Sequence, residues 1–596
     1  MADKSLNKNA ASLDETTWGH RWGYADTRFV ANPDRSVKVT GRRYAVSGYD
    51  MPDFLPFVEE MLGVHIDLDD VKPERADKPV PAPNRNAAFS DALAAALAPT
   101  QISTDARERL LHSHGQTTAD EVYQVLYTHL DRVVDMVVYP QSQADVETLI
   151  ALAAAHDVCL VPYGGGTSVS CALKLPTAET RTIVSVDMRR MDAIEWIDGE
   201  NMRACVQAGI TGSHLEERLA AEGFTCGHEP DSVELSTLGG WIATNASGMK
   251  KNRYGNIEDI VESVTLVPTR GVIEELMPKP RVSMGIEPRH VAFGSEGNLG
   301  VITRAVIKIH RLPDEKRYSS YVFRDFRAGT AFLYDLNQAG VLPASIRLVD
   351  NVQFRFGQAL KARPTNGEKL MGSIQKGYLF SLKGFDPHEI VAATIVMEGA
   401  AEEVEYQATV IKRIAARHGG VSGGAHNGQR GYMLTYAIAY IRDFLTDYHI
   451  IGETYETTVP WSRIHEVCAA VAERAAAMHR AFGLPGKPYV SPRITQIYQT
   501  GVCIYFTHGF STKGAAAPDR VFAQIEHAMR ETIMAHGGSI SHHHGIGKLR
   551  RDFMPQTLTP AAVELIRDVK DGVDPDNVFG IANNVLATGE ETVAQP

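Results

Sequence analysis

Hydrophobic positions in the middle of the chain change between the spacing of strands and the spacing of helices. The apolar run at residues 136–140 predicts a short strand. It is followed by Ser142 and Asp145, which have the spacing of a helix capping box, and then by apolar residues at helical spacing up to Ala153. A second apolar run at residues 158–163 predicts another strand. This order of strand, helix and strand predicts a βαβ unit.

The same patterns continue toward the C-terminus. Strands are predicted at 182–188, 203–209 and 260–267, and a helix is predicted at 214–221, ended by Gly223. From residue 314 to 530, long helical patterns alternate with strand patterns, which predicts a separate α+β domain. The first 130 residues contain a proline- and alanine-rich stretch at 78–97 and predict an extended arm.

Composition narrows the class of protein. The chain has 596 residues, enough for more than one domain, and its net charge of -12 opposes binding to nucleic acid. Its six cysteines form no CxxC pair, which indicates neither a disulfide framework nor a thiolate metal site and favours a reducing compartment. No apolar stretch reaches the length of a bilayer span, and neither chain end shows a recognised targeting signal. We expect a soluble protein that is at most peripheral to a membrane.

A glycine-rich turn follows the second strand of the βαβ unit. Gly164, Gly165 and Gly166 allow positive φ and close backbone approach, so that consecutive N–H groups can converge on a phosphate. A simple tight turn is the alternative interpretation. The turn matches neither GxGxxG nor the P-loop pattern. Further glycine-bearing turns at 225–232, 237–259 and 293–303 suit a backbone that packs against a flat ligand.

Five motifs together carry a family resemblance. They are PYGGGTSVS (162–170), GHEPDS (227–232), GMKKNRYGNIED (248–259), NGQRGY (427–432) and HHHG (542–545). On these motifs the chain resembles, over nearly its whole length, the alkyldihydroxyacetonephosphate synthase family, flavoproteins of the vanillyl-alcohol oxidase type. The resemblance implies an α+β, two-domain FAD-binding fold with an α+β cap domain. The expected parts are a partly helical N-terminal arm (1–130), an FAD-binding domain (131–313), a cap or substrate domain (314–540) and a C-terminal segment that returns to the flavin site (541–596).

The resemblance also implies FAD as the cofactor. We expect non-covalent binding, because the glycine-rich segments offer no histidine or cysteine at the usual attachment loop. For three of the residues that the resemblance assigns to FAD, a local role is the alternative. Asp231 and Ser232 suit a turn and helix start, and Glu296 suits the ordering of its own loop. The residues that the resemblance assigns to FAD are Pro162, Gly164, Gly165, Gly166, Thr167, Ser168, Asp231, Ser232, Thr237, Gly240, Thr244, Ser247, Glu296, Gly300, Val301 and Ile302.

Two arginines are the candidate substrate ligands. Arg347 lies in an apolar context, where a guanidinium needs a partner; Asp350 is one candidate, and the resemblance favours flavin or substrate. The resemblance implies that Arg493 binds the substrate phosphate. Tyr505 matches the family's active-site tyrosine, although an aromatic residue in a strand is more often part of a core.

Histidines are the remaining catalytic candidates. His228 suits proton transfer or a structural role. His542, His543 and His544 are interpreted as proton donors and anion partners beside the flavin. In an extended segment only the first and third of them would share a face, and no cysteine lies near in the sequence to complete a zinc site. We therefore expect no metal, and a metal site at these histidines is the alternative.

The resemblance implies a redox-neutral reaction in ether-lipid synthesis. A long-chain fatty alcohol would replace the acyl group of acyl-dihydroxyacetone phosphate, with N5 of FAD as covalent catalyst. Residues 431–440 would line an apolar channel or form an ordinary buried helix, and residues 507–509 depart from the family pattern. One alternative is an FAD-dependent D-2-hydroxyacid dehydrogenase, which carries GGSISGEHGVG where this chain has GGSISHHHGIG (537–547). A catalytically inert flavin- or lipid-binding protein is another. We expect a homodimer in a bacterial cytoplasm, with peripheral membrane contact and no nucleic acid partner.

Overall fold

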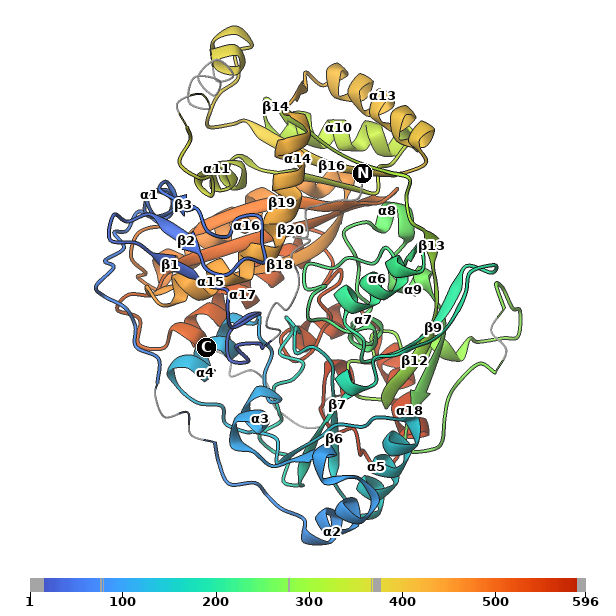
Figure 1. Ribbon diagram of the computed structural model, residues 1–596. Helices are drawn as coiled ribbons and strands as arrows, with labels where there is room; N and C mark the ends of the chain where they lie inside the picture. The colour runs from blue at the N-terminus through green and yellow to red at the C-terminus, as the bar shows by residue number, and fades with distance from the viewer. Residues whose placement is uncertain are drawn as a thin grey trace. The chain divides into compact units, whose positions relative to one another are not determined.

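A computed structural model of the chain describes residues 16–75, 78, 80–276, 279–365, 367 and 377–586 (Figure 1). The two chain ends, in which we expected no targeting signal, lie outside these residues. The chain forms two compact units. The first unit comprises residues 1–74 and 313–539, and the second comprises residues 75–312 and 540–596. The segment expected as one arm, residues 1–130, is thus divided between the units.

The second unit contains the predicted βαβ unit. Strands β5 (Met136–Val138) and β6 (Cys159–Tyr163) both run parallel to β7 (Ile183–Asp187), which lies between them, and β4 (Ile102–Ser103) pairs with β5. Helix α5 (Gln143–Ala155) begins where predicted, because the Ser142 side chain accepts a hydrogen bond from the Asp145 N–H. The strand, helix and strand order is therefore confirmed.

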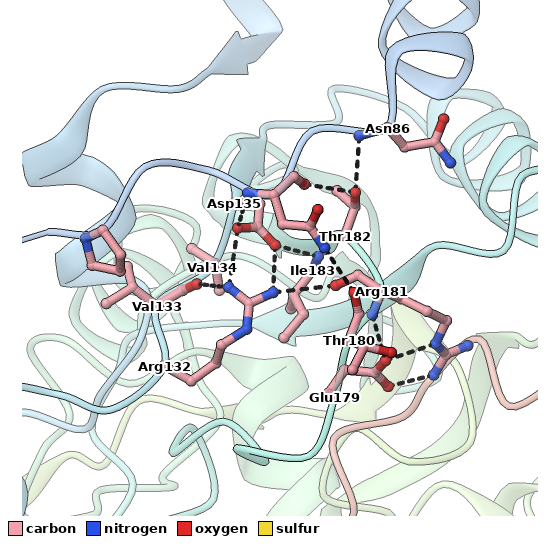
Figure 2. Close-up of polar contacts among 12 residues, drawn as sticks. Asn86, Arg132, Val133, Val134, Asp135, Glu179, Thr180, Arg181, Thr182 and Ile183 are labelled. Carbon is pink, nitrogen blue, oxygen red and sulfur yellow. Dashed lines mark hydrogen bonds and ion pairs between the residues drawn. The ribbon is translucent and has the colours of Figure 1, made fainter.

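Polar contacts attach the proline- and alanine-rich stretch to this sheet (Figure 2). The Asp135 carboxylate accepts hydrogen bonds from the backbone N–H groups of Asn84 and Ile183, both at 2.8 Å. The Asn84 side chain donates to Thr180 O at 2.7 Å, and the Asn86 N–H donates to the Thr182 hydroxyl at 3.0 Å. These bonds are the reason that residues 84–86 belong to the second unit rather than to a separate arm.

A second, antiparallel sheet completes the second unit. Its strand order is β11-β12-β9-β8, and a buried apolar cluster between this sheet and helices α6 and α7 forms its core. The elements of this part are β8 (Ile194–Asp198), β9 (Arg203–Gln207), α6 (Gly212–Ala221), α7 (Leu238–Thr244), α8 (Lys251–Tyr254), α9 (Ile257–Ile260), β11 (Val261–Val267) and β12 (Val301–Lys308). The short strands β10 (Phe224–Thr225) and β13 (His310–Arg311) pair beside it.

Helices α2 (Ala87–Ala96), α3 (Ala106–Leu111), α4 (Ala119–Tyr127) and α18 (Pro560–Val573) also belong to the second unit. In α18, buried Lys570 donates to Asn298 O at 2.8 Å and forms an ion pair with Asp574. This contact joins the C-terminal segment to the loop before β12.

A seven-stranded antiparallel sheet is the centre of the first unit. The strand order is β17-β14-β16-β15-β19-β20-β18. The strands are β14 (Glu315–Phe323), β15 (Ser345–Val349), β16 (Val391–Gly399), β17 (Val421–Ser422), β18 (Ile450–Pro460), β19 (Tyr489–Ile497) and β20 (Gly501–Ser511).

Helices cover both faces of this sheet. Figure 1 shows α10 (Phe326–Gln338) and α13 (Ala401–Arg417) side by side over β14 and β16. Helices α16 (Ile464–Ala481) and α17 (Pro518–Ala535) pack on each other and on β19 and β18. Helix α14 (Gly424–Met433) contacts β14 and β16, and α15 (Ile438–Thr446) contacts β18.

The N-terminal part of the first unit is a small sheet with one helix. Strands β1 (Phe29–Ala31), β2 (Val37–Val39) and β3 (Asp50–Met51) precede α1 (Phe54–Leu62). The ring of Phe54 lies 6.2 Å from Phe356 in α11 (Asn351–Ala359) and 6.1 Å from Phe444 in α15. Across the described residues, no helix has the length and apolar character needed to cross a bilayer.

Candidate active site

The glycine-rich turn lies directly against the segment that precedes α7. A Cβ atom on Gly165 would lie 1.9 Å from Leu235 O, and one on Gly164 would lie 2.4 Å from the Thr237 hydroxyl oxygen. Gly166 has φ +67°, a left-handed conformation that glycine adopts without strain. Thr237 is the N-cap of α7, and its side chain accepts from the Gly240 N–H. The structure therefore brings the two predicted cofactor segments together.

The backbone amides of this turn can bind an anion. Within the described parts of the chain, the N–H groups of residues 165–168 donate no hydrogen bond to a protein acceptor. Gly165 and Gly166 are nevertheless buried. Buried donors need a partner, and consecutive amides at a glycine turn suit phosphate oxygens. The turn fits the pyrophosphate of FAD.

The other residues predicted to bind FAD lie in the same unit. Gly300 leads into β12, and a Cβ on it would lie 2.7 Å from Val267 O, so Val301 and Ile302 pair closely with β11. The remaining positions are Pro162 in β6, Asp231 and Ser232 in the turn before α7, Gly240 and Thr244 in α7, and Ser247, whose hydroxyl donates to Asn256.

Glu296 binds a different loop from its own. Its Oε1 atom accepts hydrogen bonds from the backbone N–H groups of Ile546 at 2.7 Å and Gly547 at 2.9 Å. Its Oε2 atom accepts from the Asn584 side chain at 3.2 Å. Burial raises the pKa of this carboxyl above its ordinary value, against the lowering effect of these hydrogen bonds. The expectation that Glu296 orders its own loop is wrong for the side chain.

The three adjacent histidines lie on a bend, not on a strand. His542 Nδ1 and His543 Nδ1 are 2.7 Å apart, and the rings of His543 and His544 have centroids 4.5 Å apart. The expected alternation of side chains across a strand is therefore wrong, because glycines at 545 and 547 with positive φ turn the backbone immediately afterwards.

His228 lies near this bend in the second unit. Its ring packs against Trp241 at 4.6 Å, and within the described residues neither ring nitrogen has a hydrogen-bond partner. Burial, with a further contribution from His543, lowers the pKa of His228 to about 3. The ring is neutral at physiological pH, so it suits a hydrogen-bonding role better than that of a proton donor.

The two candidate arginines share one face of the large sheet in the first unit. Val349 pairs with Arg493, and Arg493 pairs with Tyr505, so Arg347, two residues before Val349, projects from the same face. The Arg493 guanidinium lies 4.4 Å from the centre of the Tyr505 ring. Arg347 donates to the Thr435 hydroxyl at 2.5 Å. The structure thus brings Arg347, Arg493 and Tyr505 together on one face of the sheet, which we call the polar face.

Asp350 has a structural role beside this face. Its carboxylate accepts from the Ser491 hydroxyl at 2.6 Å and from the Gln353 N–H at 2.9 Å, as the N-cap of α11. Burial raises the pKa of Asp350 to about 7.

The comparisons with known proteins identify the family. A curated alkyldihydroxyacetonephosphate synthase of Caenorhabditis elegans is 43% identical over 571 residues, 95% of this chain and 95% of that protein. The chain belongs to the alkyldihydroxyacetonephosphate synthase family. The synthase of Dictyostelium discoideum is 30% identical over 594 residues, 97% of this chain and 95% of that protein. A solved alkyldihydroxyacetonephosphate synthase structure superposes with a TM-score of 0.82 at 28% identity, covering 95% of this chain and 99% of the other.

Family models agree with this assignment. Residues 134–277 match the FAD binding domain family, and residues 312–580 match the C-terminal domain of FAD linked oxidases. The predicted α+β, two-domain FAD-binding fold and the FAD cofactor are confirmed. The chain is an FAD-dependent enzyme of the alkyldihydroxyacetonephosphate synthase type, and its activity belongs to ether-lipid synthesis.

The structure also shows residues of the polar face that no sequence motif indicated. Glu456 is fully buried and pairs with Tyr505 across β18 and β20, so it lies on the same polar face. The Thr454 hydroxyl donates to the Tyr505 hydroxyl at 3.0 Å. Polar residues at every second position of β18 were a signal for this face. Thr435 gave no such signal, because its contact with Arg347 joins segments far apart in the sequence.

The segment that departs from the family pattern divides between the two faces of the sheet. Thr507 projects from the same face as Tyr505, whereas His508 projects from the opposite face, toward α17. Tyr432 and Thr435 of the 431–440 segment contact Arg347 on the polar face, and Tyr432 is buried.

Proposed function

We propose that this chain exchanges the acyl group of acyl-dihydroxyacetone phosphate for a long-chain fatty alcohol and forms alkyl-dihydroxyacetone phosphate without net redox change. The observation that carries the proposal is the buried polar face of the first unit. Arg347 and Arg493 occupy diagonal positions on neighbouring strands there. Residues in such diagonal positions lie roughly 7–8 Å apart in an antiparallel sheet. Two buried guanidinium groups at this spacing suit one phosphate dianion, which can take a bidentate contact from each.

The residues around Arg493 would orient the phosphate end of the substrate. The Tyr505 ring packs against the guanidinium, and the hydrogen bond from Thr454 fixes the phenol. Arg347 is fixed by Thr435. A charged group held by packing and hydrogen bonds loses little entropy when the substrate binds.

The histidines of the second unit would move protons. The hydrogen bond between the Nδ1 atoms of His542 and His543 needs one Nδ1 with a proton and one without, so the pair can take up a further proton. Once protonated, such a pair suits donation of a proton to the departing carboxylate, and it can then take up the proton of the incoming alcohol. When bound, FAD would supply the nucleophilic N5 that links covalently to the substrate carbon.

The experiment that tests the proposal compares two reactions of the purified, FAD-loaded protein. Palmitoyl-dihydroxyacetone phosphate with hexadecanol should give the alkyl ether and one equivalent of palmitate. D-Lactate with a dye acceptor should give no dye reduction above the protein-free rate. Dye reduction without ether formation would overturn the proposal in favour of a hydroxyacid dehydrogenase, and absence of both activities would favour an inert flavin- or lipid-binding protein.

We also propose a homodimer in a bacterial cytoplasm that meets its lipid substrates at a membrane surface. The six cysteines all lie within the described residues and form no disulfide bond there, which supports a reducing compartment. Sedimentation analysis and fractionation of the producing cells test these points. A monomer, or a protein confined to an oxidising compartment, would contradict them.

A further inference from the structure

The backbone that follows the histidine triplet is bound closely on two sides. On one side, the N–H groups of Lys548 and Leu549 donate to Ser170 O at 3.0 and 3.2 Å. On the other side, Glu296 accepts the N–H groups of Ile546 and Gly547. The bend that carries the histidines therefore continues directly into a segment held between the glycine-turn region and the loop before β12.

Glycine is required at both bends of this segment. A Cβ on Gly545 would lie 2.4 Å from Glu296 Oε1, and one on Gly547 would lie 2.0 Å from Ser170 O. Both residues have positive φ, +79° and +52°. The carboxylate and the backbone are in such close contact that the position of Glu296 determines where the bend lies.

Glu296 is itself held rigidly. Its N–H donates to Ala243 O at the C-terminal end of α7 at 2.9 Å, and its carbonyl accepts from the Asn583 side chain at 2.8 Å. Its own φ is +47°, and the residue is 7% exposed. A left-handed, buried glutamate is costly to maintain, which points to a function for its side chain.

We propose that Glu296 is a positioning residue that places His542, His543 and His544 for proton transfer by holding the Ile546 and Gly547 amides. The proposal rests on the proposed function, since it assigns those histidines the proton-transfer steps. Glu296 acts through the backbone and needs no contact with substrate. Its charge is not essential, because one oxygen accepts both N–H groups and an amide oxygen can do the same.

Three substitutions separate this role from a general effect on folding. Glu296→Gln keeps the acceptor, Glu296→Ala removes it, and Glu296→Asp keeps the charge but is one methylene too short to reach. Misplacement of a catalytic group by about 1 Å costs about 10²-fold in rate. We therefore expect kcat for ether formation to fall about 100-fold in the Ala variant and to stay within about threefold of wild type in the Gln variant, with KM for the acyl substrate and FAD content unchanged.

Asp135→Ala is the matched control. Asp135 is also a buried carboxylate of the second unit that accepts two backbone N–H groups, but it binds Asn84, Ile183 and the Arg132 guanidinium instead of the histidine segment (Figure 2). It should lower the melting temperature and leave kcat of the FAD-loaded enzyme unchanged. An equal loss of kcat in both Ala variants would overturn the proposal. If Glu296→Ala does not fold, the Asp variant decides, and wild-type kcat there refutes the positioning role.

A double variant tests whether Glu296 acts through the histidines. If it does, Glu296→Ala added to His543→Ala should cause no further loss of kcat, whereas independent roles would multiply. Hydrogen exchange of the Ile546 and Gly547 amides gives a readout that needs no activity. Slow exchange in wild type and the Gln variant, with fast exchange in the Ala variant, is expected. If wild type forms no ether, the proposed function fails, while amide exchange still shows whether Glu296 holds the Ile546 and Gly547 N–H groups. Unchanged exchange in the Ala variant would refute only this holding role of Glu296.

Discussion

His508 should make the first unit sensitive to acid. Its ring is 1% exposed and packs 5.4 Å from Phe510 and 6.4 Å from both Phe522 and Tyr455. Within the described residues, neither ring nitrogen has a hydrogen-bond partner. Burial, with a smaller contribution from His479, lowers the pKa of His508 from 6.5 to about 3. The folded protein therefore holds a neutral imidazole that the unfolded chain would protonate.

The sign and size of the effect follow from linkage. Below pH 6.5 the His508 imidazole is protonated in the unfolded state but stays neutral in the folded state, so the free energy of unfolding falls as pH falls. The loss is about 1.4 kcal/mol per pH unit below that point and continues toward the folded pKa near 3. Between pH 8 and pH 5.5 it amounts to about 1.4 kcal/mol, or roughly 2 °C in melting temperature for a unit of this size.

The assay compares melting temperatures of wild type and His508→Leu at pH 8 and pH 5.5. Leucine removes the titrating group and keeps an apolar side chain of similar size, so the melting temperature of the variant should fall by roughly 2 °C less than that of wild type on acidification. Its stability at pH 8 does not enter the comparison. His426→Leu, at an exposed histidine of the same unit, controls for the loss of a histidine as such. Equal acid sensitivity of wild type and His508→Leu would refute a buried neutral ring.

Three further predictions concern the site. Arg493→Lys loses the bidentate fork and should lower kcat/KM for the acyl substrate by about 1.5–3 kcal/mol, roughly 10- to 160-fold, with FAD retained; loss of FAD instead would relocate Arg493 to the cofactor. Gly165→Ala places a methyl group against Leu235 O and should destabilise the fold by about 1–3 kcal/mol and weaken FAD retention, measured by flavin fluorescence after gel filtration. Gly572→Ala, in open space on α18, is its control and should preserve both. Acid precipitation should release all flavin colour, and colour left on the pellet would contradict non-covalent binding.

Local signals in the sequence were enough for part of the second unit, namely helices α5 and α6 and strands β5, β6, β7, β9 and β11. The Ser142 cap and the apolar spacing after it act within one or two turns of helix, so α5 begins where the pattern predicts. The place of β7 between β5 and β6 could not be predicted, because strand order depends on pairing between distant segments. The same reason explains the divided N-terminal segment, whose contacts at Asn84 and Asn86 reach residues 180 and 182.

The candidate site shows the same limit at the level of side chains. Alternation along β19 and β20 indicates which residues of each strand share a face, but only the register places Arg493 opposite Tyr505 and Glu456 beside it. The family resemblance therefore indicated Arg493 and Tyr505 as candidates, but the strand patterns could not indicate their neighbours.

At the histidine bend, contacts with residues far away in the sequence determine a backbone conformation that the local sequence pattern does not predict. Three adjacent histidines have no local reason to leave an extended conformation, and alternation of their side chains was a sound expectation from sequence. The bend depends on acceptors at Ser170 and Glu296, hundreds of residues away, which bind the amides of residues 546–549. Two glycines then become necessary, because the acceptors approach closer than any Cβ would permit. The two glycines after the histidines are therefore explained by close contact with Ser170 O and Glu296 Oε1. The bend that these contacts stabilise brings the imidazoles of His542 and His543 within hydrogen-bonding distance.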